Sequence, residues 1–182
     1  IEKSYFKLNN EHWEHIHTLS YKITRETILQ CFQIKIIHRI FPCNRNLFLW
    51  SIKDYDICNF CETQTHDTTE HYFFHCPYNK TFWQSFKAWW YDLSGININL
   101  NVYDIIFGML NYEENEILSL LNYLILAAKW YIYLCKKEDN NLIFHQYLVH
   151  IKVHVETEKY VMYKNGKAND FHKQRDILYP HI

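Results

Sequence analysis

Two pairs of metal-ligand residues constrain the fold of this chain more than any other feature. They have the spacing Cys58-x2-Cys61, then nine residues, then His71-x4-Cys76. Two cysteines two residues apart can wrap one metal ion through a tight turn, while a second pair closes the other side of a tetrahedron. Residues 58–77 contain few aliphatic side chains that could form a core of their own. The spacing therefore predicts one structural Zn²⁺ ion that gives this segment its shape.

Two other histidines compete for the same ion. His75 follows His71 by four residues, on nearly the same helical face, and His66 lies in the loop between the two pairs. We favour Cys76 over His75, because a third thiolate binds zinc strongly and an unused thiol beside a metal is a liability. We also favour His71 over His66. The remaining alternative is that these side chains are unrelated members of a chain with 12 histidines. Four protein ligands leave no open position, which favours a structural over a catalytic zinc.

The residues between the two pairs predict a short helix that presents the third ligand. A capping-box arrangement at Asp67–Glu70 would place His71 in the first helical turn. His71 and Cys76 are five residues apart, about 140° around an ideal α-helix. The helix must therefore loosen before Cys76, and Pro77 is placed to help.

The rest of the chain predicts a mainly α-helical protein, a helical domain with a small inserted zinc knuckle. Apolar residues recur every four positions from Ile28 to Ile40, Thr24 can cap this helix, and Pro42 stops it. Three further helical patterns run from Asn79 to the residue before Gly95, from Glu113 to Lys137 and from Leu142 to Tyr163. We expect a weakly helical or poorly fixed arm over residues 1–23, a unit of basic helix, knuckle and aromatic helix over 24–95, and a helical tail over 96–182.

Charge is unevenly distributed along the chain. The formal net charge of −1 argues against a surface that attracts nucleic acid everywhere. From Ser20 to Lys53, however, six basic residues stand against one acid, a local excess of +5. We expect four of them to contact the phosphates of a nucleic acid: Lys35, Arg39, Arg45 and Lys53. The alternative is that they form an ordinary solvated face.

The tryptophans and the isolated cysteines are expected to lie in the core. Trp83, Trp89 and Trp90 could stack on unpaired bases, but their helical spacing favours packing. Free cysteines are usually small buried residues, and we expect this of the three outside the knuckle: Cys31, Cys43 and Cys135. Clustered thiols beside a histidine also indicate a reducing, intracellular compartment.

No pattern for catalysis, a membrane or a small-molecule substrate stands out. Phosphate-binding glycine loops, nucleophile elbows and paired catalytic carboxylates are not found. The acidic residues Glu113, Glu114 and Glu116 suit a helix start. Polar residues interrupt the apolar stretch 117–134, which favours a buried helix over a membrane span. A strip of histidines at positions 145, 150 and 154 could bind a metal, although a solvated or partly satisfied face is the commoner outcome.

Several of these motifs together resemble the zinc-binding C-terminal region of LINE-type non-LTR retrotransposon reverse transcriptases. The resemblance is specific over about residues 25–95 and rests on Leu29–Pro42, Asn46-Leu47, the Cys, Cys, His and Cys positions, Asp67–Cys76 and Phe82-Trp83. Ile105–Gly108 and Leu126–Ile132 look like the helical tail of vertebrate elements of this type. Related tails often close on a basic-Trp motif, where this chain has Arg175-Asp176-Ile177.

The resemblance implies an accessory role rather than a complete enzyme. In that family the polymerase and the endonuclease lie upstream, so this chain is expected to be an excerpt that engages template RNA or target DNA in target-primed reverse transcription. The implied zinc ligands are Cys58, Cys61, His71 and Cys76. Its partners would be RNA or DNA and the upstream polymerase domain, in the cytoplasm and nucleus. The alternative is a zinc-stabilised protein-interaction or scaffolding module without nucleic-acid contact.

Overall fold

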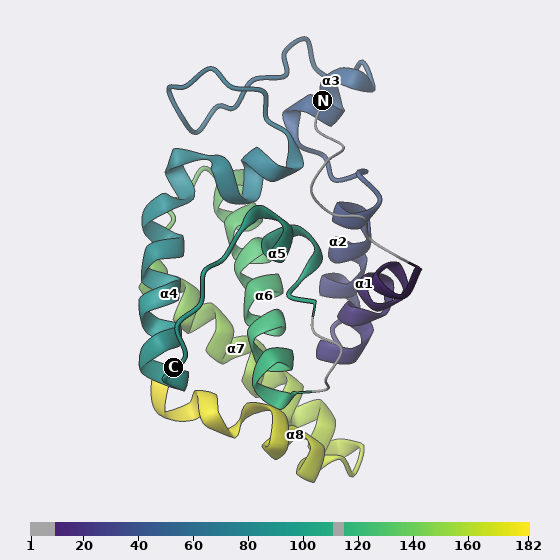
Figure 1. Cartoon of the computed structure of the whole chain (residues 1–182), viewed down its shortest axis with the longest axis vertical. Coiled ribbons are helices and arrows are strands. Elements are labelled where there is room, and N and C mark those ends of the chain that lie inside the picture. The colour runs from purple at the N-terminus through teal and green to yellow at the C-terminus, as the bar shows by residue number, and fades with distance from the viewer. Residues whose placement is uncertain (1–9, 111–114) are drawn as a thin grey trace.

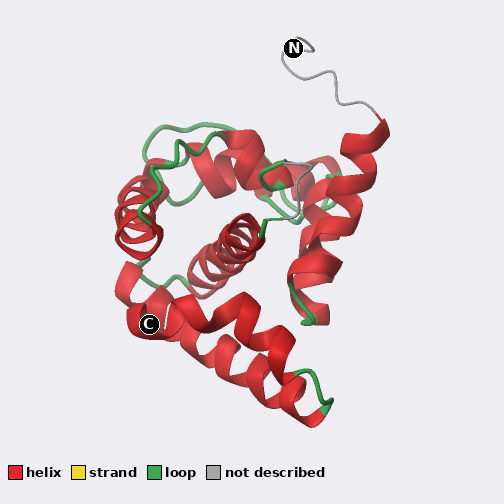
Figure 2. Cartoon of the chain, turned by 60° about the horizontal axis from the view of Figure 1, so that its bottom comes forward, coloured by secondary structure: helices red, strands yellow, loops and turns green. Residues whose placement is uncertain are grey.

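The computed structural model describes residues 10–110 and 115–182, which form a mainly α-helical protein (Figure 1). The helices are α1 (Asn10–Ile23), α2 (Thr27–Ile37), α3 (Asn44–Leu49), η1 (His71–His75), η2 (Pro77–Asn79), α4 (Lys80–Ser94), α5 (Val102–Phe107), α6 (Glu116–Glu138), α7 (Phe144–Lys164), α8 (Ala168–Arg175) and η3 (Asp176–His181). Within the described residues there is no strand (Figure 2). The predicted fold class, helices with a small Cys- and His-containing insertion, is confirmed.

Helix α6 lies at the centre of the fold, in contact with α1, α2, α5, α7 and α8 (Figure 1). Every residue from Leu120 to Lys129 is buried, which confirms the buried helix expected over residues 117–134. Among the described helices, α6 alone is long and apolar enough to cross a membrane, and 67% of its apolar window is buried inside the fold. The core helix of a globular protein has this property.

Helix α2 buries the middle of the apolar stripe predicted for it, which Leu29 and Ile37 widen, but not the two ends of that stripe. Its buried residues are Leu29, Phe32, Gln33, Ile36 and Ile37. Ile28 and Ile40, the ends of the predicted apolar stripe, are 54% and 52% exposed. That part of the prediction was wrong, because Gln33 turns inward to donate from Nε2 to the carbonyl oxygen of Ile106, at 2.9 Å. The helix also ends at Ile37, well before Pro42.

Helix α1 is fixed to the bundle over the part that the structure describes. Ile16, Leu19 and Ile23 are buried, so residues 10–23 form an ordinary amphipathic helix, while residues 1–9 lie outside the described part. Gly108, at the end of α5, has a φ of +87°, and a Cβ there would lie 2.3 Å from Cδ2 of Leu19. A glycine at this position therefore lets α1 and α5 approach closely. Glu113 and Glu114, of the predicted acidic cluster, lie outside the described residues.

The C-terminal tail forms two further helical segments despite its polar sequence. After α7 the chain turns at Gly166, whose φ is +69°, and α8 returns to pack against α6 and α7 (Figure 1). Arg175, at the end of α8, is only 1% exposed. Its Nε donates to Oε2 of Glu158 at 2.9 Å, and its guanidinium also donates to the carbonyl oxygen of Ile23 at 2.8 Å. Arg175 thus ties the tail to both α7 and the end of α1.

Lys129 makes the stability of the fold depend on pH. Its side chain is 2% exposed, with Nζ 2.5 Å from Oε1 of Gln33, and burial lowers the pKa of Lys129 from 10.5 to about 7. Between these two values the unfolded chain binds more protons than the folded chain, so stability rises with pH. We expect the free energy of unfolding to increase by about 1 kcal/mol from pH 7.5 to 8.5. Urea denaturation of Lys129→Met should show a slope against pH that is lower by this amount; equal slopes in the two proteins would contradict the assignment.

Candidate metal centre

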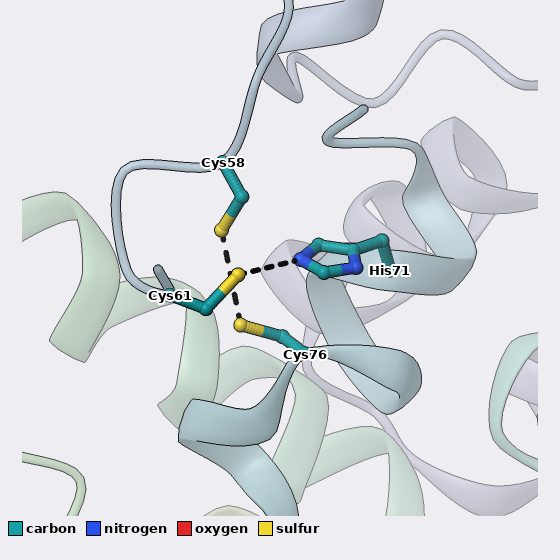
Figure 3. Close-up of side chains that lie close together, drawn as sticks. All are labelled: Cys58, Cys61, His71 and Cys76. Carbon is teal, nitrogen blue, oxygen red and sulfur yellow. Dashed lines mark hydrogen bonds between the residues drawn. The ribbon is translucent and has the colours of Figure 1, made fainter. Parts of the chain in front are cut away.

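The structure brings the four predicted ligands to one point. The ligand atoms of Cys58, Cys61, His71 and Cys76 all lie within 4.8 Å of one another, so this cluster could hold a metal ion. Figure 3 shows the three sulfur atoms and a ring nitrogen of His71 converging. The sulfur atoms of Cys58 and Cys76 are 3.8 Å apart, and Sγ of Cys61 is 3.4 Å from Nε2 of His71.

The separation of the Cys58 and Cys76 sulfur atoms fits a tetrahedral ligand shell. With metal–sulfur distances of about 2.3 Å, two sulfur ligands on one tetrahedron lie about 3.8 Å apart. The Cys58–Cys76 separation of 3.8 Å equals this edge. Four protein ligands at the corners leave no position for water or substrate, so an ion held here would support structure rather than catalysis.

A short hairpin presents the first pair of cysteines. Its ends are joined by an isolated antiparallel bridge between Ile57 and His66, with the amide of Cys58 donating to the carbonyl oxygen of Thr65 at 2.9 Å. At the turn, the amide of Phe60 points at Sγ of Cys58, 3.4 Å away. An N–H group directed at the sulfur stabilises a thiolate, the form in which cysteine binds a metal.

A widened helical turn presents the second pair. The amide of Cys76 donates to the carbonyl oxygen of His71 at 2.9 Å, which is a bond between residues five positions apart. Such a turn is wider than an α-helical turn and brings positions i and i+5 toward the same side. The predicted loosening of the helix before Cys76 is therefore confirmed, and Pro77 begins the next helical segment, η2.

The predicted capping box at Asp67–Glu70 is wrong. The side chain of Thr68 accepts the amide of His71 at 3.2 Å, so the hydroxyl supplies the capping bond inside this segment. Asp67 caps a different helix, since its Oδ2 accepts the amide of Asn44 at 3.0 Å at the start of α3. Glu70 is paired with Arg39. Asp67 and Glu70 therefore contact Asn44 and Arg39, which precede the knuckle, instead of forming the local capping box.

The two rival histidines lie outside the cluster. His75 is exposed, and the group of convergent ligand atoms does not include it. His66 is also exposed, and its Nδ1 lies 2.8 Å from a carboxylate oxygen of Asp56. The geometry therefore agrees with the choice of Cys76 over His75 and of His71 over His66.

The electrostatics differ among the side chains of the cluster. The hydrogen bond between the two sulfur atoms lowers the pKa of Cys76 and, together with burial, raises the pKa of Cys58. Burial, followed by the positive charge of Lys136, lowers the pKa of His71. A neutral imidazole keeps the lone pair that metal coordination requires.

Lys136 on α6 is a component of this site that the sequence analysis missed. Its side chain is buried, and Nζ donates to the carbonyl oxygen of Tyr72 at 2.9 Å. The same ammonium lies 4.4 Å from the ring centre of Tyr72, 5.3 Å from that of Phe60 and 5.6 Å from that of Tyr78. A divalent ion with three thiolates and a neutral imidazole carries one net negative charge, which Lys136 can balance. No local pattern relates residue 136 to the knuckle.

Of the four basic residues predicted to contact phosphates, three make polar contacts with side chains of the same chain. Arg39 forms an ion pair with Glu70, and Arg45 forms one with Asp56. Nζ of Lys53 donates to Oδ1 of Asn44 at 2.8 Å. Lys35 is exposed on α2.

The other residues named from the sequence occupy ordinary structural positions. Trp83 and Trp90 are buried and Trp89 packs against the core, which confirms their predicted packing role. Cys43 and Cys135 are buried as expected, but Cys31 is exposed, so the prediction for that residue was wrong.

Comparison with known proteins adds no assignment. No family model, no curated protein and no solved structure matches this chain.

Proposed function

We propose that the cluster of Cys58, Cys61, His71 and Cys76 holds one structural Zn²⁺ ion. Three soft sulfur ligands and an imidazole at the corners of a tetrahedron are the donor set that zinc prefers. The support for a structural role is the closed geometry, in which all four ligand atoms lie within 4.8 Å of one another. The ion would fix the hairpin to the widened turn that follows it.

We further propose that the chain is an accessory, nucleic-acid-binding segment of a LINE-type non-LTR retrotransposon reverse transcriptase. It would engage template RNA or target DNA in the cytoplasm and nucleus, beside a polymerase domain that supplies the catalysis. The observation that supports this most is the attachment of basic side chains to the knuckle, where Glu70 and Asp56 hold Arg39 and Arg45 in place. A guanidinium that one carboxylate holds in place keeps further N–H groups for a phosphate oxygen, and it loses little additional side-chain entropy when it binds one.

A variant of Lys35 tests this function without disturbing the ion pairs described above. Lys35 is exposed, so its reversal to Glu leaves the ion pairs of the knuckle intact. We expect Lys35→Glu to weaken binding of a structured RNA or a nicked DNA and to reduce the slope of log K against log salt by about 1. Lys152→Glu is the matched control, because Lys152 is an exposed lysine on α7. Equal losses in the two variants would indicate a general charge effect and contradict the assigned face.

A charge swap tests Arg39 without unpairing its partner. In the double variant Arg39→Glu and Glu70→Arg, the pair and the net charge are kept but the two charges exchange places. A phosphate contact at Arg39 predicts weaker binding for this variant at unchanged zinc content. Unchanged binding would remove Arg39 from the interface.

One observation favours the alternative of a protein-interaction module. The segment from α3 to the hairpin projects beyond the helices in Figure 1, and its exposed apolar side chains are Phe48, Leu49, Trp50, Ile52, Tyr55 and Ile57. Grouped apolar exposure of this kind usually marks a protein contact. If the zinc-loaded chain binds neither RNA nor DNA at low salt, this surface becomes the better account of the knuckle.

A further inference from the structure

Helix α7 carries a second group of potential metal ligands, far along the chain from the knuckle. His150 and His154, one helical turn apart, have their Nε2 atoms 3.0 Å from each other. Nδ1 of His154 lies 2.5 Å from Oε2 of Glu26, the residue that precedes α2. Both histidines are partly buried, whereas His145 on the same helix is exposed. The three histidines of the predicted strip therefore differ in environment.

The contact with Glu26 determines which ring nitrogen of His154 carries the proton. A carboxylate can only accept, so Nδ1 of His154 donates to it, and in the neutral ring the lone pair of Nε2 is directed at His150. The two facing Nε2 atoms can share one proton of His150. If that proton moves to Nδ1 of His150, both Nε2 lone pairs become free to bind one metal ion. Burial, and next the neighbouring His154, lowers the pKa of His150 to about 4, so His150 is neutral at physiological pH.

The separation of the two nitrogens indicates which ions fit. With metal–nitrogen distances of about 2.0–2.1 Å, atoms 3.0 Å apart subtend an angle of about 94° at the ion. This is close to the right angle between neighbouring ligands in square-planar or octahedral coordination and well below the tetrahedral angle. Cu²⁺ and Ni²⁺ prefer tetragonal sites with nitrogen and oxygen ligands.

Glu26 adds a reason for a cation at this place. Its Oε1 atom is buried and has no hydrogen-bond partner among the described residues, so half of the carboxylate is left without compensation. A carboxylate that orients a ligand histidine through the other ring nitrogen is a common arrangement around bound metals. Water can complete the coordination, since the histidine side chains are not fully buried.

We propose that His150 and His154 form a second metal site, distinct from the knuckle, which takes a divalent ion with tetragonal preference such as Ni²⁺ or Cu²⁺. Glu26 acts as a positioning residue that fixes the tautomer of His154. Because Glu26 adjoins α2 and the histidines belong to α7, the hydrogen bond that fixes this tautomer joins the N-terminal and C-terminal parts of the bundle. The site requires neither zinc in the knuckle nor nucleic-acid binding.

The test uses the full chain with its knuckle loaded with zinc, and Ni²⁺ as the probe, because copper also oxidises thiols. Equilibrium dialysis should show one equivalent of Ni²⁺ bound while the zinc content stays constant. We expect His150→Gln and His154→Gln each to weaken Ni²⁺ binding at least tenfold. Glu26→Gln should weaken it about tenfold through the lost orientation of His154. His145→Gln, the matched control on the same helix, should bind Ni²⁺ as the unaltered chain does.

A spectroscopic measurement on a chain with both histidines intact gives a test that does not depend on whether the histidine variants fold. One equivalent of Cu²⁺ on the zinc-loaded Cys31→Ser chain, which lacks the exposed thiol of Cys31, should give an electron paramagnetic resonance spectrum of tetragonal copper with coupling to two nitrogen atoms. Absence of this signal, or Ni²⁺ binding that survives His150→Gln combined with His154→Gln, would overturn the proposal. Loss of Ni²⁺ binding in His145→Gln would also overturn it, because the exposed histidine would then be the ligand.

Discussion

Cys58→Ser should release the zinc ion and unfold the knuckle while the helical bundle persists. Structural zinc contributes about 10–16 kcal/mol in small zinc-dependent folds, so loss of one ligand in four removes about 3 kcal/mol or more. This corresponds to a fall in affinity of over a hundredfold. Cys58 and Cys76 lie outside the cluster of core residues that unites the helices. Circular dichroism should therefore change little, while the zinc retained in the presence of a competing chelator falls from one equivalent toward zero.

The unfolding can be followed at single amides. The amides of Cys58 and Asp67 donate across the hairpin to Thr65 and Asp56, respectively, and their hydrogen exchange should become fast in Cys58→Ser or after chelation. Cys31→Ser is the matched control, since Cys31 is an exposed cysteine on α2. A chain that keeps slow exchange at these amides after complete removal of the metal would contradict the structural role.

Variants of His71 and His75 identify the third ligand by the same metal analysis. His71→Ala should lose the ion, because Nε2 of His71 faces the sulfur of Cys61. His75→Ala should keep it, because His75 is exposed and outside the cluster. The reverse result would shift coordination to His75 and require a different turn from the one described.

Arg175→Met should destabilise the bundle by about 3–5 kcal/mol, the usual cost of leaving a buried charge without its partner. The partner here is Glu158, whose side chain is 5% exposed against 1% for Arg175. The substitution also removes the cation from the face of Tyr123, where the guanidinium carbon lies 3.9 Å from the ring centre. Urea denaturation at a fixed zinc concentration measures the loss.

The double variant Glu158→Leu with Arg175→Met separates charge from packing. Removing both members of a buried ion pair is often neutral or stabilising, so we expect most of the lost stability to return. If the double variant is as unstable as Arg175→Met, the hydrogen bond to Ile23 carries the effect instead. A change of less than 1 kcal/mol in the single variant would show that the ion pair contributes little.

The candidate metal ligands could be predicted because their signal is local. Cys58, Cys61, His71 and Cys76 follow one another within a short segment, and zinc geometry limits the spacings that work. Lys136 could not be predicted in this way, because α6 reaches the knuckle only through the tertiary fold. The same limit applies to the pair of Glu26 and His154, which are distant in sequence.

The positions of the helices along the chain were predicted better than the residues that each helix buries. Apolar spacing identified α4, α6 and α7 to within a few residues, since each has a long apolar or aromatic pattern. In α2, however, apolar residues occur on most sides, and the inward turn of Gln33 decided which face was buried. Helix α8 has a polar sequence, and its place in the fold depends on Arg175, whose buried partners come from other elements.

The position of the knuckle in the chain also affects how the protein is made. Ribosomal synthesis delivers the N-terminal residues first, so all four candidate metal ligands have been synthesised before α6, α7 and α8. Closing so short a loop costs little chain entropy compared with bringing Arg175 to Ile23. With the proposed ion bound, the hairpin can therefore form early, and Lys136 arrives later on a helix that packs against it.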